Sequence, residues 1–248
     1  MQLKEREERR EKKTAGVAND LPEGVTRYVR LGQELKDGKV FVVLADPDDW
    51  YFYFVHEDSN FAKRETYVRK HTCLNSPRKP GASLADYDRP NKDVCLSCRA
   101  KAKRKLYFMV PVYDPQYGTW RVLDLKEFHA TNLIADYDKL EKSARKFNKN
   151  YTLVGDAVRI FRTNSTPTTY GLESAEVEDD VLEAAKEYIG YDFDYETLAN
   201  FRSEEDIRNI LKEASAEHVD KSVLGDGVDD DEVTPIKDDE DVNPEDLF

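Results

Sequence analysis

Residues 70–105 constrain this chain most, because they contain all three of its cysteines. The stretch opens with His71 and Cys73 and closes with the pair Cys95 and Cys98. A Cys-x-x-Cys pair with a third cysteine and a histidine upstream is the usual ligand set of a closed tetrahedral zinc site. Two residues that are two apart share one face of an extended segment. The sequence therefore predicts one structural Zn²⁺ held by His71, Cys73, Cys95 and Cys98.

The competing interpretation of three cysteines is a disulfide with one free thiol. The odd number of cysteines and the charged N-terminus, which is not a secretory signal, argue against it. The 21 residues between Cys73 and Cys95 are mostly polar and include three prolines. Such a loop has no core of its own, so metal ligation would supply its folding energy. Four protein ligands leave no open coordination position, which favours a structural over a catalytic metal.

Charge is distributed very unevenly along the 248 residues, whose formal net charge is −13. Residues 1–170 carry a net charge of +8, and residues 171–248 carry −21. A basic body with an acidic trailing segment is typical of a polyanion binder that carries its own competitor. No apolar run is long enough to span a membrane, so we expect a cytoplasmic protein with no membrane partner.

Short β-strands dominate the first two thirds of the sequence. Residues 39–45 and 50–55 read as a hairpin, in which Trp50, Phe52 and Phe54 face the core and Tyr51 and Tyr53 face outward. Further strands are predicted at 63–72, 105–113 (with Pro111 at an edge or bulge), 119–123 and 151–161, and a helix at 125–148.

These elements predict a mainly β (α+β) fold. The expected architecture is a five-stranded OB-fold barrel with an inserted zinc-binding loop, although an SH3-like barrel or another antiparallel α+β fold would have a similar pattern. The predicted organisation is a charged arm and connector at 1–24, the core at 25–170 with a zinc subdomain at 70–105, acidic helices within 171–221 (175–189 and 203–216), and a disordered acidic tail at 222–248.

Aromatic and basic residues are interleaved in the predicted strands. Single-strand binding needs aromatic faces for base stacking and cations for phosphates. Cross-strand pairing is the alternative role for outward tyrosines. The predicted nucleic-acid-binding residues are Tyr51, Tyr53, Lys63, Arg64, Tyr67, Arg69, Lys70, Arg99, Lys101, Lys103, Arg104, Lys105, Tyr107, Tyr113 and Arg159.

Motifs for nucleotide hydrolysis, serine hydrolases and zinc proteases do not occur in the sequence. We therefore expect a protein that is not an enzyme.

The order His71, Cys73, Cys95, Cys98 within a basic, aromatic barrel, followed by an acidic tail, resembles the zinc-containing single-stranded DNA-binding (helix-destabilising) proteins of T-even-like phages. His56 is a second candidate for the histidine ligand. The resemblance implies an OB fold that coats DNA, with self-association along DNA through a basic arm, here near Lys12, Lys13 and Thr14.

The chain's last residues are similar to the acidic tails of bacterial single-stranded DNA-binding proteins. That similarity implies that Asp246, Leu247 and Phe248 bind partner proteins of replication, recombination or repair. The resulting hypothesis is a protein that coats single-stranded DNA. The alternative is a zinc-ribbon transcription or assembly factor that acts mainly through protein contacts.

Overall fold

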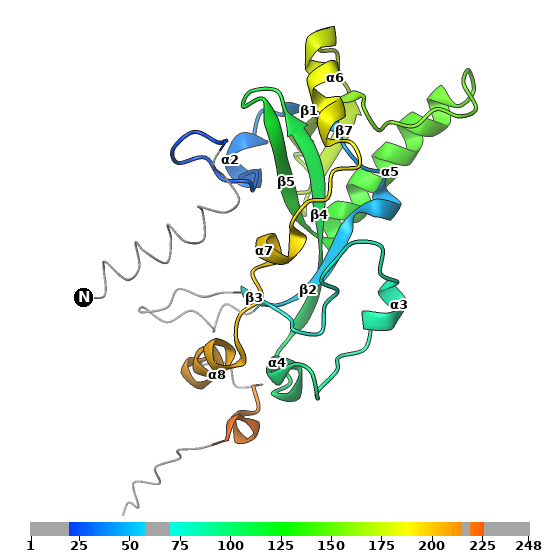
Figure 1. The fold of residues 1–248 in the computed structure, drawn as a ribbon. Coiled ribbons are helices and arrows are strands. Elements are labelled where there is room, and N and C mark those ends of the chain that lie inside the picture. The colour runs from blue at the N-terminus through cyan, green and yellow to red at the C-terminus, as the bar shows by residue number, and fades with distance from the viewer. Residues whose placement is uncertain (1–19, 58–69, 215–218, 226–248) are drawn as a thin grey trace, which may run out of the picture.

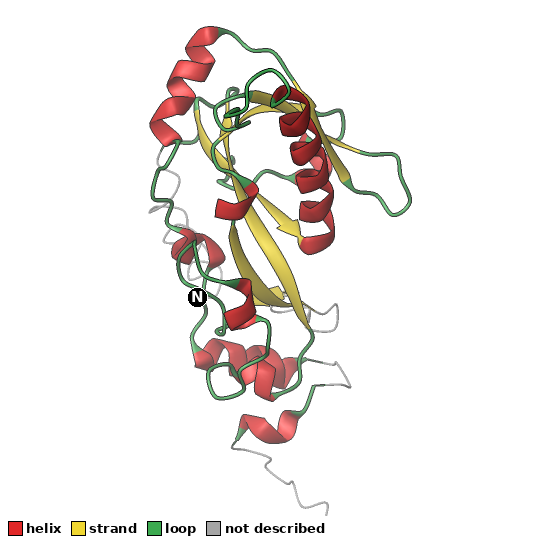
Figure 2. Cartoon of the chain, turned by 90° about the vertical axis from the view of Figure 1, so that its right-hand side faces the viewer, coloured by secondary structure: helices red, strands yellow, loops and turns green. Residues whose placement is uncertain are grey.

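The structure, a computed structural model, describes residues 20–57, 70–214 and 219–225. Within these ranges the chain is an α+β fold built on one open, antiparallel sheet with helical segments on both faces (Figures 1 and 2). The strands are β1 (Lys39–Val43), β2 (Tyr51–Glu57), β3 (Lys70–Thr72), β4 (Arg104–Asp114), β5 (Thr119–Lys126), β6 (Ala157–Arg162) and β7 (Tyr170–Ser174).

The helices are mostly short. They are α2 (Leu31–Glu34), η1 (Pro47–Asp49), α3 (Leu84–Tyr87), α4 (Leu96–Arg99), α5 (Glu127–Ala144), α6 (Asp179–Ala185), η3 (Lys186–Tyr188), α7 (Tyr195–Ala199), α8 (Glu204–Glu213) and η4 (Lys221–Leu224). In the described ranges, no helix combines the length and the apolar character that crossing a bilayer requires.

Strand β4 is the centre of the sheet. The strand order is β3-β2-β4-β1-β6-β7, and β5 pairs with β4 along its other edge. β1 and β2 follow one another along the same edge of β4, with Val43 opposite Val112 and Tyr51 opposite Met109. The residues between β1 and β2 therefore form a corner, and the predicted hairpin is wrong. Pro111 lies in β4 between the part that pairs with β2 and the part that pairs with β1, so no strand lies beside it on that edge. This is as expected for an edge or bulge position.

The predicted closed barrel is also wrong, because the described strands form an open sheet that ends at β3 and β7. The strands predicted at 105–113 and 119–123 and the helix predicted at 125–148 are confirmed as β4, β5 and α5. In the predicted strand 151–161, regular pairing begins at Ala157. β7 was missed because it lies across the predicted boundary at residue 170.

Helix α5 covers one face of the sheet. Ala130, Leu133 and Tyr137 are spaced to lie on one side of the helix, and all three are buried. They pack into a cluster with residues of β1, β4, β5, β6 and β7, including Phe41 and Leu123. Burial of this apolar stripe, rather than intrinsic helix propensity, holds α5 on the sheet.

Residues 185–201, which we call the strap, cover the opposite face. The strap runs along the sheet between α6 and α8 (Figure 1). Its buried side chains are Ala185, Phe193, Tyr195, Leu198 and Ala199, which pack on the tyrosine face of β2 and β4. The tyrosines predicted to face outward are therefore interior residues.

Helix α8 packs against α4 and the residues that follow it. Ile207, Ile210 and Leu211 form an apolar cluster with Leu96 and Ala100. The side chain of Ser203 accepts a hydrogen bond from the backbone N–H of Asp206, as its N-cap position predicts. The predicted acidic helices thus pack on the rest of the molecule.

Candidate functional site

Three elements bring the cysteines and one histidine together. His56 lies near the end of β2, and Cys73 follows β3. Cys95 is the N-cap residue of α4, and Cys98 lies within that helix. All four side chains are buried. The cluster packs on Phe52 and Phe54, which share a face of β2 with His56 because side chains alternate along a strand.

The spacing of the ligand atoms suits one tetrahedral ion. Cys73 Sγ lies 3.7 Å from Cys95 Sγ and 3.5 Å from Cys98 Sγ, and His56 Nε2 lies 3.5 Å and 3.6 Å from the same two sulfurs. Tetrahedral bonds to Zn²⁺ would place sulfurs about 3.8 Å apart and nitrogen about 3.5 Å from sulfur. All four atoms lie within 4.8 Å of one another, so the cluster can hold one metal ion.

The imidazole of His56 is oriented by its second nitrogen. Nδ1 lies 3.1 Å from the carbonyl oxygen of Ala102 and 3.2 Å from that of Lys103. A carbonyl accepts only from a protonated nitrogen, so Nδ1 carries a hydrogen and Nε2 is the nitrogen that faces the cysteines. Metal-binding histidines usually have this arrangement.

The prediction of His71 as a ligand is wrong, because His56 occupies that position. His71 pairs directly with His56 across β2 and β3, and the two rings stack with centroids 5.4 Å apart. Nε2 of His71 lies 2.7 Å from Ser97 Oγ rather than among the sulfurs. The sequence signal that identifies His56 is its alternation with Phe52 and Phe54 on the core face of β2.

Ionisation of the cluster favours a cation at its centre. The pKa of Cys95 falls well below its usual value, because hydrogen bonds from Cys73 and Cys98 and the nearby His56 outweigh the effect of burial. Burial opposes the charged form of His56, but hydrogen bonds and charges of Cys73 and Cys95 raise its pKa to about 9. A divalent ion would displace these protons and neutralise the thiolates.

Arg104, predicted to bind phosphates, instead ties the loop before α4 to the sheet. Its guanidinium donates hydrogen bonds to the carbonyl oxygens of Asn75, Tyr87 and Asp88 at 2.7–3.0 Å. It also lies 3.4 Å from the ring centroid of Phe54. These contacts satisfy the loop's carbonyls and leave Arg104 with a structural role.

A cleft of about 1020 Å³ opens beside the metal cluster, between residues 26–31, strands β2 and β3, and the end of the strap. We call it the β3 cleft. The basic side chains in its lining are Arg27, Lys70, Arg78 and Arg202, and the aromatic ones are Tyr28, Tyr53 and Phe201. His71 lines it as well, so the metal cluster and the β3 cleft share the short strand β3.

Two of the cations remain partly accessible although each pairs with an acid. Lys70 contacts Asp124 at 2.7 Å and keeps 42% of its side chain exposed. Arg78 contacts Glu196 at 2.8 Å, keeps 46% exposed, and stacks 3.6 Å from the ring centroid of Phe201. Exposed pairs of this kind are weak and exchange readily with other anions.

The β3 cleft contains two of the predicted nucleic-acid residues, Tyr53 and Lys70. It adds Arg27, Arg78, Phe201 and Arg202, which lie outside the runs of basic and aromatic residues that guided the prediction. Burial of Tyr51, Tyr53, Tyr107 and Tyr113 at exposures of 0–5% makes the prediction of an open tyrosine surface wrong.

The remaining predicted residues are dispersed. Lys101 pairs with Asp220, Lys105 with Glu57, and Arg159 with Glu173 on the far strands β6 and β7. Arg99 donates to the carbonyl oxygen of Lys92, and Lys103 is exposed. The predictions that lie outside the described residues are the roles of Lys12, Lys13, Thr14, Lys63, Arg64, Tyr67, Arg69, Asp246, Leu247 and Phe248.

Known proteins supply no further guide to this site. The chain matches no protein-family model, no curated protein and no solved structure.

Proposed function

We propose that this protein binds single-stranded DNA, and that the β3 cleft is its main contact. The observation that supports the proposal is the grouping of cations with aromatic rings in one cleft. Single strands are bound without sequence preference where cations meet phosphates and aromatic rings meet bases. In the β3 cleft Lys70 and Arg78 would bind phosphates, and Phe201, which lines the cleft and lies beside Arg78, would stack on a base.

In this proposal the metal is Zn²⁺ with a structural role. His56, Cys73, Cys95 and Cys98 would fill its coordination sphere, which leaves no position for a substrate. The ion would hold α4 and the loop before it against β2, and thereby position β3 at the wall of the β3 cleft. Lys70 would then depend on the metal for its place, although it is not a ligand.

The proposal is tested by titrating fluorescein-labelled oligo-dT with the full chain and following anisotropy at several salt concentrations. We expect binding that weakens steeply with salt, because phosphate contacts release counterions. The double variant Lys70→Gln with Arg78→Gln should bind more weakly and reduce the salt slope by about 1.4, because two phosphate contacts are lost. The matched control, Lys36→Gln with Lys92→Gln, removes two exposed lysines outside the β3 cleft and should retain most of the affinity.

Absence of binding at low salt by a zinc-loaded, folded chain would refute the proposal. That result would favour the zinc-ribbon transcription or assembly factor, which needs the metal and the fold but no DNA contact. Equal losses in the two double variants would show that net charge, rather than the β3 cleft, determines binding.

A further inference from the structure

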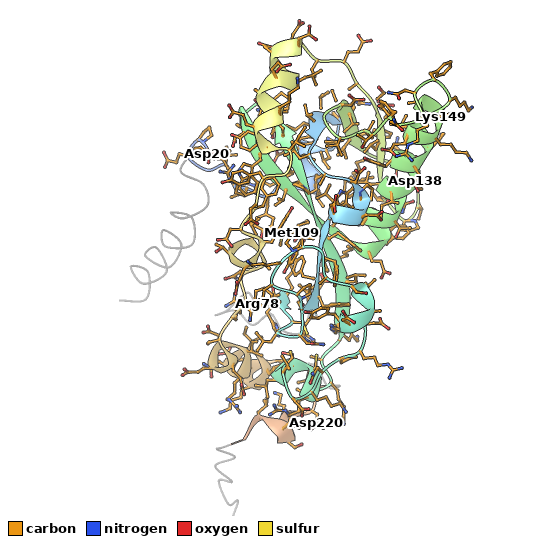
Figure 3. All side chains as sticks on the ribbon, turned by 45° about the vertical axis from the view of Figure 1, so that its right-hand side comes forward. Asp20, Arg78, Met109, Asp138, Lys149 and Asp220 are labelled. Carbon is orange, nitrogen blue, oxygen red and sulfur yellow. The ribbon has the colours of Figure 1, made fainter. Side chains whose placement is uncertain are left out.

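The C-terminal end of α5 carries an exposed aromatic ring that is not part of the hydrophobic core. Phe147 is 94% exposed, the highest value among the large hydrophobic residues that stand open in the described ranges. Residues 139–149, which we call the α5 tip, also contain Lys139, Lys142, Lys146 and Lys149, all exposed. Figure 3 places Lys149 at the outer end of α5 and Arg78 in a different part of the molecule, so the α5 tip and the β3 cleft are separate surfaces.

The turn that presents Phe147 is held by specific hydrogen bonds. The backbone N–H groups of Phe147 and Asn148 donate to the carbonyl oxygen of Ala144 at 2.9 Å and 3.1 Å, and that of Tyr151 donates to Asn148 at 3.1 Å. Arg145 donates through Nε to the carbonyl oxygen of Tyr151 at 2.9 Å. Phe147 is therefore directed into solvent by an ordered turn.

The four lysines, which we call the lysine stripe, follow one another at spacings of three, four and three residues. Lys139 and Lys142 lie on one side of α5, which ends at Ala144, and Lys146 and Lys149 lie in the turns beyond it, on either side of Phe147 in the sequence. None of them forms an ion pair with a described residue, since the recorded pair at this end of α5 joins Arg145 to the buried Glu141. Like charges at this spacing destabilise a free helix by a few tenths of a kcal/mol each. A bound polyanion would remove that repulsion.

Helix capping accounts for part of this arrangement. Cations in the last turn interact favourably with the negative end of the helix dipole, which explains Lys142 and Arg145. The dipole effect fades within one turn, so it does not explain Lys139. It also gives no reason for an exposed phenylalanine beyond the helix end.

We infer that the α5 tip is a second contact for single-stranded DNA, in which Phe147 stacks on a base and the lysine stripe binds the neighbouring phosphates. The inference rests on the proposed function and extends it to a surface away from the β3 cleft. One isolated ring between cations matches base stacking. A membrane-binding helix needs a broad apolar face, whereas the apolar stripe of α5 is buried against the sheet.

The experiment compares two oligo-dT lengths, about 4 nucleotides and about 16 nucleotides, the range over which single-strand sites vary. Phe147→Ala should bind the longer strand about tenfold more weakly, the loss expected for one stacked base, and should bind the shorter strand like the unmodified chain. Phe147→Tyr should restore the affinity. Phe128→Ala is the matched control, because Phe128 is a half-exposed phenylalanine on the first turn of the same helix.

The lysines are tested in the same titration. Lys142→Gln, Lys146→Gln and Lys149→Gln together should reduce the salt slope for the longer strand by about 2, as three lost phosphate contacts require. The control replaces Lys36, Lys92 and Lys186, three exposed lysines elsewhere. The substituted positions are on the surface, so folding is not at risk.

The possible failures are distinguishable. If the unmodified chain binds neither strand, the proposed function and the α5 tip inference both fall. If the unmodified chain binds both strands and the α5 tip variants bind them with the same affinity, the inference falls while the proposed function stands. The same holds if Phe128→Ala loses as much affinity for the longer strand as Phe147→Ala. Phe147-dependent binding to vesicles of phosphatidylglycerol and phosphatidylcholine, without an effect on DNA, would assign the α5 tip to a membrane surface instead.

Discussion

The ring of Tyr195 in the strap stacks on the ring of Tyr51 in β2, with centroids 4.8 Å apart and an interplanar angle of 16°. Both side chains are buried. The strap thus occupies the tyrosine face in the way that a stacked base would, and it does so as part of the hydrophobic core. An open binding surface on that face would require removal of core residues.

Replacement of Tyr195 by Ala should lower the free energy of unfolding by about 3 kcal/mol, because it creates a cavity beneath the strap and removes an aromatic pair. Urea unfolding followed by circular dichroism measures this loss. Tyr191→Ala, at a position that is 51% exposed, should cost clearly less. If Tyr195→Ala leaves stability unchanged and tightens oligo-dT binding, the strap is a displaceable cover and not core.

Replacement of His56 by Ala should abolish stoichiometric metal binding, because three thiolates would lack their fourth ligand. His71→Ala should retain about one metal per chain, since His71 contacts Ser97 rather than the cluster. Elemental analysis of the purified variants decides between them. Metal loss in His71→Ala and retention in His56→Ala would reverse the assignment of the ligand.

Replacement of Arg104 by Ala should destabilise the loop before α4, because three carbonyl oxygens lose a charged donor and Phe54 loses its stacked guanidinium. We expect a loss of about 2–3 kcal/mol in the free energy of unfolding. Lys103→Ala, one residue away and exposed, is the control and should change stability by less than about 0.5 kcal/mol. Equal effects would mean that Arg104 contributes only surface charge.

Acid should destabilise the fold in a defined pH range through Glu34. Burial opposes ionisation of this carboxyl, but hydrogen bonds from Arg121, the backbone of Arg30 and Lys39 lower its pKa from 4.5 to about 2. A lowered pKa in the folded state adds stability above pH 4.5 that is lost as pH falls toward 2.

Unfolding at several pH values tests this contribution. Glu34→Gln should be less stable than the unmodified chain at pH 7, because Arg121 and Lys39 then keep only Asp114 as a charged partner among the described residues. It should also lose less stability between pH 4.5 and 2. Parallel pH profiles for the two chains would show that Glu34 does not contribute to acid sensitivity.

Local patterns were informative wherever neighbours in sequence decide the structure. The alternation of Phe52 and Phe54 predicted the core face of β2, the apolar spacing predicted that α5 is a helix, and the cysteines predicted a metal cluster. The predictions that failed concern contacts between residues that are far apart in the sequence. Nothing near Tyr51 signals that Tyr195 will cover it, because the apolar residues of the strap lie in an acidic segment some 140 residues later.

The choice between His56 and His71 shows the same limit. The two residues are in register across β2 and β3, so both reach the neighbourhood of the cysteines. The position of α4, which no local pattern specifies, decides which imidazole meets the sulfurs and which meets Ser97. Likewise the β3 cleft combines residues from 27 to 202, and no single run of sequence contains its cations.

The pairing of β4 with β1, β2 and β5 has a consequence for the order of folding during synthesis. β1 and β2 leave the ribosome first, but their partner begins only at Arg104, and β1 also pairs with β6, where Lys39 lies opposite Ile160. Contacts so distant in sequence close slowly. The aromatic strand β2 therefore emerges long before β4, and the nascent chain depends on rapid completion of β4 to shield it from aggregation.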